Sequence, residues 1–116
     1  MTEDNNGTTL AHYAALIGHR AALRALHALG VDLATEANNG LTPAHYAAMN
    51  GHEAALHALH ALGVDLATKD NNGFTPAHYA AINGHEAALR ALHALGVDLA
   101  TADTNGTTRW SEDSWW

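Results

Sequence analysis

The chain has 116 residues, the size of a single domain, with 5 lysines and arginines against 12 aspartates and glutamates. Its formal net charge of −7 argues against a nucleic-acid surface, because proteins that bind phosphates usually present a basic patch. The absence of cysteine excludes disulfides, thiolate metal sites and thiol catalysis, and it leaves the redox compartment undetermined. The sequence contains no apolar run near the roughly 20 residues of a membrane helix, and its polar, acidic N-terminus is unlike a signal peptide. We therefore expect a soluble protein of cytoplasmic type, with no membrane partner and with its compartment otherwise unknown.

An internal repeat organises the chain. Glycines recur at intervals of 33 residues, at Gly7, Gly40, Gly73 and Gly106. The repeat defines full units at residues 4–36, 37–69 and 70–102, followed by a partial unit and a tryptophan-rich tail at 103–116. The second and third units differ at only five positions. Units of this size stack to bury a shared core, so we expect one domain over residues 1–116.

Each unit carries signals for two helices, which are clearest in the second unit. Thr42 is a suitable N-cap before Pro43, and proline is well tolerated at the first helical position. This pair predicts a short helix over residues 44–49 that ends near the following Asn-Gly pair. A second helix is predicted over residues 53–62, and glycine ends it. The Asn-Asn-Gly sequence at residues 71–73 then predicts a turn into the next unit.

The recurring sequence reads Asn-Asn-Gly-x-Thr-Pro-Ala-His-Tyr-Ala-Ala, then Gly-His, then Leu-Gly-Val-Asp-Leu, and it resembles the ankyrin repeat. The resemblance covers residues 4–102. It implies an all-α solenoid of stacked helix-turn-helix units joined by β-turn or hairpin-like loops. It also implies non-catalytic binding of another protein on a concave face. The sequence departs from the family pattern in the first unit, where Leu10 replaces the proline, and at Ala44 and Tyr46, where leucine is commoner.

Nine of the ten histidines form three rows with one member in each unit. The rows are His12, His45 and His78; His19, His52 and His85; and His27, His60 and His93. The resemblance implies that the first row bonds to neighbouring backbone and to the threonine hydroxyl, and that the second row steadies the loop between the helices. A neutral imidazole suits both roles, because it offers one donor and one acceptor.

His57, which belongs to no row, and His60 of the third row could instead bind a metal ion on the second helix of the second unit. Glu53, His57 and His60 are three or four residues apart and would share one helix face. The other units have Arg24 and Arg90 in place of His57, so such a site would occur only once. We therefore expect no metal and no cofactor. We also expect no catalytic residues and no enzyme activity, because the chain has no nucleophile elbow, phosphate loop or dinucleotide motif.

The resemblance places the concave face on the turn tips and the first helices. Grouped apolar residues on that face would mark an interaction site, and Phe74 is the expected anchor because aromatic residues dominate binding hot spots. The predicted partner-binding residues are Asn39, Leu41, Met49, Asn50, Asn72, Phe74, Ile82 and Asn83. In the alternative interpretation, Met49 and Ile82 pack between units and the asparagines only close their own turns.

All three tryptophans, Trp110, Trp115 and Trp116, lie in the last eight residues. A solenoid needs a polar cap at each end, and no polar helix pair follows the third unit. We therefore expect Leu89, Leu92 and the alanines around them to face an open end, which the tryptophans cap. The alternatives are that the tail docks into a neighbouring copy, giving an open assembly, or that it makes neither contact.

These observations predict a protein-binding scaffold whose partner is another protein of unknown identity. Two alternatives stay open. The first is a structural module that self-associates through its C-terminal tail. The second is an engineered or consensus repeat scaffold without a native ligand, because near-identical units also result from design or from recent duplication.

Overall fold

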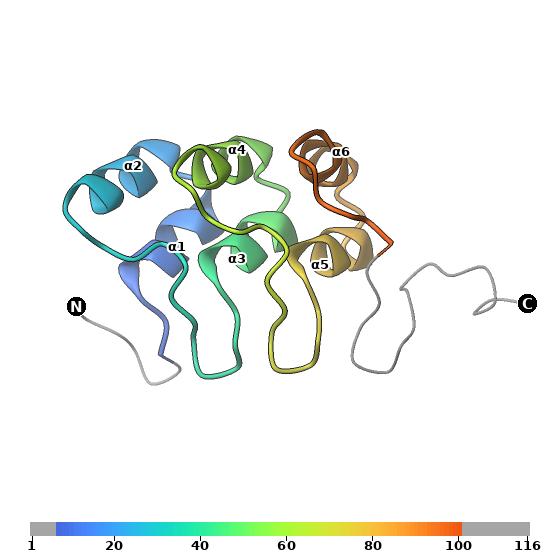
Figure 1. Cartoon of the computed structure of the whole chain (residues 1–116), viewed down its shortest axis with the longest axis horizontal. Helices are drawn as coiled ribbons and strands as arrows, with labels where there is room; N and C mark the ends of the chain where they lie inside the picture. The colour runs from blue at the N-terminus through green and yellow to red at the C-terminus, as the bar shows by residue number, and fades with distance from the viewer. Residues whose placement is uncertain (1–6, 101–116) are drawn as a thin grey trace, which may run out of the picture.

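In a computed structural model of the chain, residues 7–100 are described, and they form six helices in three consecutive pairs (Figure 1). No residue in this range lies in a strand. The predicted all-α fold is therefore confirmed. The pairs are α1 (Leu10–Ile17) with α2 (Arg20–Ala28), α3 (Pro43–Met49) with α4 (Glu53–Ala61), and α5 (Pro76–Ile82) with α6 (Glu86–Ala94).

The helices are arranged in two layers (Figure 1). The first helices α1, α3 and α5 form one layer, in which α3 contacts both of its neighbours. The second helices α2, α4 and α6 form the other layer, in which α4 contacts both of its neighbours. The loops between units extend past the first-helix layer, so the turn tips lie on the side away from the second helices (Figure 1). We call the surface formed by the turn tips and the first helices the turn face.

Local sequence signals set the helix ends. Thr42 is the N-cap of α3, and its side chain accepts a hydrogen bond from the backbone N–H of His45. After α3, Gly51 has a φ of +74°, a left-handed conformation that favours glycine. The predicted first helix is confirmed, and the second ends at Ala61, one residue earlier than predicted. Leu62 is instead the C-cap residue, whose N–H bonds to the last turn.

The core consists mainly of alanine and leucine. All but one of the alanines of the first helices are buried, and such small side chains let neighbouring helices approach closely. Leu89 is half-buried, as expected near an open end, but the same expectation for Leu92 is wrong because this residue is fully buried. The equivalent Leu59 is also buried, whereas Leu26 of the first unit is half-buried. This leucine position therefore faces the preceding unit.

The predicted cap residues Trp110, Trp115 and Trp116 lie outside residues 7–100. Within that range, none of the helices has the length and apolar character that crossing a membrane requires.

Candidate functional site

The buried histidines of the first row connect each turn to the next unit. The backbone N–H of Thr42 donates to Nδ1 of His45 over 3.0 Å, and Nε2 of the same ring donates to the carbonyl of Phe74 over 2.9 Å. His12 repeats this arrangement, with Nε2 2.8 Å from the carbonyl of Leu41. Because Nδ1 accepts, the proton lies on Nε2 and the ring is neutral. The structural role implied for this row is confirmed at His12 and His45.

Burial keeps the His45 ring neutral. Desolvation lowers the pKa of His45 below its usual value of 6.5. The hydrogen bond to the Phe74 carbonyl and the charges of Asp70 and Glu36 act in the opposite direction but do not outweigh desolvation. The neutral ring links the second unit to the third through its two nitrogens.

Asparagines at the ends of the first helices form a second set of links. Nδ2 of Asn50 donates to the carbonyl of Leu16 over 2.8 Å, and His52 Nε2 donates to the same carbonyl over 2.9 Å. Asn83 Nδ2 donates in the same way to the carbonyl of Met49. Asn50 and Asn83 were predicted as partner contacts; their side chains are exposed, but each also bonds to the preceding unit.

The turn tips are joined by their own asparagines. Asn39 Oδ1 accepts a bond from the N–H of Leu41, which closes the turn. The side chain of Asn71 donates to the carbonyl of Asn38, and its N–H donates to the carbonyl of Asn39. Adjacent turns therefore lie side by side. Asn39 and Asn72, both predicted as partner contacts, are exposed at these tips.

The four predicted apolar contacts differ in exposure. Ile82 is 51% exposed, and Met49 and Phe74 are half-buried. The Phe74 ring packs 5.4 Å from His78 and 5.6 Å from Tyr79, measured between ring centroids. Leu41 is only 8% exposed, so its expected exposure is wrong. Described units flank Leu41 on both sides, whereas the described structure flanks Phe74 on one side only.

The sequence analysis missed a buried carboxylate in the third turn. Asp70 Oδ1 accepts bonds of 2.9 Å from the N–H groups of Asn72 and Phe74, and Oδ2 accepts a bond from the hydroxyl of Tyr79. Burial and the Asp70 carboxylate raise the pKa of Tyr79 above its usual range. An aspartate before Asn-Asn-Gly is typical of a turn that an Asx side chain closes, and this signal predicts the backbone bonds. Ala37 holds the same position in the second unit.

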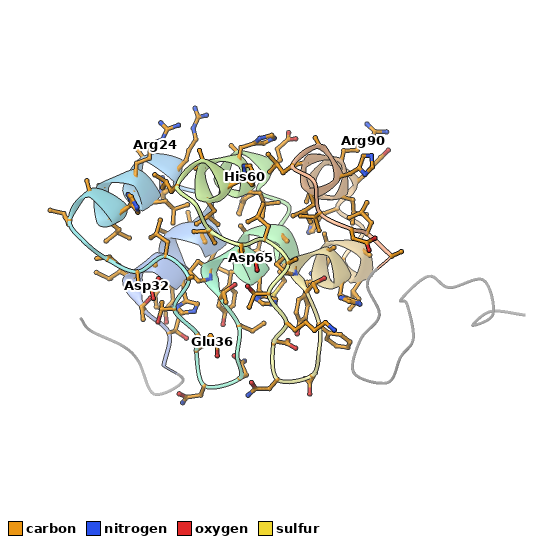
Figure 2. All side chains as sticks on the ribbon, in the orientation of Figure 1. Arg24, Asp32, Glu36, His60, Asp65 and Arg90 are labelled. Carbon is orange, nitrogen blue, oxygen red and sulfur yellow. The ribbon has the colours of Figure 1, made fainter. Side chains whose placement is uncertain are left out.

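The second-helix layer exposes charged and histidine side chains. Figure 2 places Arg24, His60 and Arg90 on this layer and Glu36 among the turns. Glu53, His57 and His60 are exposed on α4. Across residues 7–100, no group of three or more histidines and carboxylates is arranged to hold a metal ion.

Paired helices stacked in two layers, with hydrogen-bonded turns along one side, define an α-solenoid repeat protein. A family model for ankyrin repeats (many copies) matches residues 20–60 and 44–93, which together cover more than half of the chain. The chain therefore belongs to the ankyrin repeat family. Domains of this family generally bind other proteins and are typically non-catalytic. A comparison with curated proteins gave no match.

Proposed function

We propose that this chain is a non-catalytic scaffold that binds another protein on its turn face. The observation that carries the proposal is a row of apolar side chains with one member in each unit: Leu16, Met49 and Ile82. The first two are half-buried, and Ile82 is 51% exposed. Such a row on one face gives a partner a continuous apolar contact.

The row is held in place by bonds between units. The carbonyls of Leu16 and Met49 accept bonds from Asn50, His52 and Asn83 of the units that follow. The spacing between apolar side chains is therefore fixed before a partner arrives. A surface ordered in advance loses less conformational entropy on binding, which favours affinity.

Phe74 supplies a further contact beside the row. Its half-buried ring is oriented by packing against His78 and Tyr79, so an aromatic edge is presented in a defined position. Aromatic residues in such positions often dominate binding energy. The exposed side chains of Asn39 and Asn72 add hydrogen-bonding groups at the turn tips, and Glu36 and Lys69 add charges of both signs.

Comparative capture tests the proposed face. The bait proteins are the full chain, Ile82→Asp and Leu29→Asp. Leu29 is a matched control, because it is an exposed leucine at the end of α2, in the other layer. Proteins retained from a cell extract are compared between baits by quantitative mass spectrometry, after circular dichroism has shown equal helix content.

A partner of the turn face should be lost with Ile82→Asp and kept with Leu29→Asp. Phe74→Ala should weaken the same partner while leaving the helical signal intact. Retention of every partner by both Ile82→Asp and Phe74→Ala would contradict the proposed surface.

A further inference from the structure

Equivalent leucines reveal an uncovered surface on the third unit. Leu89 of α6 and Leu99 of the segment after it are half-buried, although their equivalents in the first two units are buried. Those buried equivalents are Leu23, Leu33, Leu56 and Leu66. In the first two units another helix pair follows, whereas no described helix follows α6. Leu89 and Leu99 therefore form a surface that a further unit would cover.

This surface is a groove. It has a volume of about 410 Å³ and is lined by Glu86, Leu89, Arg90, His93 and Leu99. The two leucines supply its apolar part. Arg90, which pairs with Glu86 on the same helix, and His93 supply positive or ionisable groups at its edge. Because the Glu86 carboxylate offsets the charge of Arg90, the groove suits an apolar segment.

The repeat register directs the rest of the chain toward this groove. The Nε2 bonds of His12 and His45 each reach a carbonyl 29 residues further along the chain. The residue 29 positions after His78 is Thr107. Residues 103–108 also keep the Asp-x-Asn-Gly-x-Thr pattern of residues 70–75. A turn formed there in register would leave the residues after Thr108 beside the third unit.

We propose that residues 109–116 fold back onto the third unit and that their tryptophans cover Leu89 and Leu99 in place of a fourth helix pair. Leu99 itself lines the groove, so the tail leaves the described structure next to its own binding site. This short connection gives the tail a high effective concentration there. Indole rings supply large apolar area, which matches the leucines of the groove.

Intrinsic fluorescence tests the proposal directly, because every tryptophan of the protein lies in residues 110–116. Emission of the full chain is compared with that of a synthetic peptide of residues 101–116, with light scattering to measure mass. The chain should emit at shorter wavelength than the peptide and be less quenched by acrylamide, at concentrations where it is a monomer. Emission equal to that of the peptide overturns the proposal. A blue shift seen only when the chain is oligomeric also overturns it, and assigns the tail to a second copy.

Two groove variants and one control locate the contact. Leu89→Ser and Leu99→Ser should both move the emission toward that of the peptide, whereas Leu29→Ser, at the opposite end of the stack, should not. Circular dichroism checks each fold. If Leu89→Ser loses helix content, Leu99→Ser decides, since it lies outside the helices. Unchanged emission in a folded groove variant overturns the proposed site.

Discussion

Single residues supply the polar links that hold one unit to the next. His12 and His45 are buried, and each uses both ring nitrogens, one as acceptor within its unit and one as donor to the next. A buried polar group left without such bonds would cost roughly 1–3 kcal/mol. A protonated Nδ1 cannot accept a hydrogen bond, so protonation of His45 would break its bond from the N–H of Thr42.

We expect the free energy of unfolding to decrease as the pH falls below 6.5. Burial lowers the pKa of His45 in the folded chain, so the unfolded chain binds the proton first. The contribution of His45 to stability is therefore fully present above pH 6.5 and is lost progressively as the pH falls toward its folded pKa. Urea unfolding from roughly pH 8 to pH 5 measures the effect.

Variants at two histidines of the second unit test this assignment. His45→Gln should flatten the dependence of stability on pH, and His57→Ala, at an exposed position of α4, should leave it unchanged. A dependence that is the same in His45→Gln and in the unchanged chain would contradict the role given to His45.

Asp70 allows a second prediction, and Ala37, at the equivalent position of the second unit, allows the reverse substitution. Asp70→Ala should lower the free energy of unfolding by roughly 1–3 kcal/mol, because it removes the acceptor of two backbone N–H groups and of the Tyr79 hydroxyl. Ala37→Asp should raise stability, since it places a carboxylate at the same point of the second turn. Denaturant unfolding measures both. An unchanged stability in Asp70→Ala would show that these bonds are replaced by water without loss.

At the scale of the helix pair, the ends of α1 and α3 pack against the unit that follows. Gly51 has a φ of +74°, and a Cβ added there would lie 2.7 Å from Nδ1 of His85. Gly84 has almost the same φ, +73°, but nothing lies within 4 Å of an added Cβ. The two glycines share a backbone conformation and differ in their surroundings.

Gly51→Ala should therefore destabilise the protein more than Gly84→Ala. Both variants incur the left-handed strain of about 1–2 kcal/mol, and only Gly51→Ala adds a steric clash with the His85 ring. Thermal or urea unfolding of the two variants gives the difference. Equal losses would contradict close packing of His85 against the end of α3.

The helices were predictable because their signals are local. Thr42 and Pro43 mark the start of α3, and glycine follows each helix pair at a fixed distance, whichever unit is considered. The burial of Leu41 and Leu92 was not predictable in this way. Leu41 lies in the turn before α3 and is covered because described units flank it on both sides. For Leu92, stacking decides which side of the helix faces the preceding unit, and the spacing of leucines within one helix does not contain this information.

The candidate site was predicted only in part for a similar reason. The resemblance to the family identified the turn tips and first helices as a group, and Ile82 has the expected exposure. Asn50 and Asn83 also link units, because their side chains donate to carbonyls 34 residues earlier in the chain, and the sequence of one unit does not reveal these bonds. The pairing of Asp70 with Tyr79 depends on how the turn folds back over α5.

On the largest scale, residues 7–100 form a stack whose middle unit differs from the first and third units. In the first unit, Ile17 occupies the position of the linking asparagines and is 60% exposed, because no described unit precedes it. Leu10 and Tyr13 are exposed on the same helix. In solenoids stability is approximately the sum of unit and interface terms, so end units contribute fewer interfaces than the middle one. The turn face, in contrast, continues from one unit to the next.

The claim that this turn face binds the partner is tested most directly by hydrogen–deuterium exchange, with and without a partner recovered in the capture experiment. We predict that the bound partner slows amide exchange in residues 38–50 and 71–83, which include the turns, α3 and α5. Exchange in α4 and α6, on the other layer, should stay unchanged. Slower exchange confined to α4 and α6 would contradict the account and place the binding surface on the second helices.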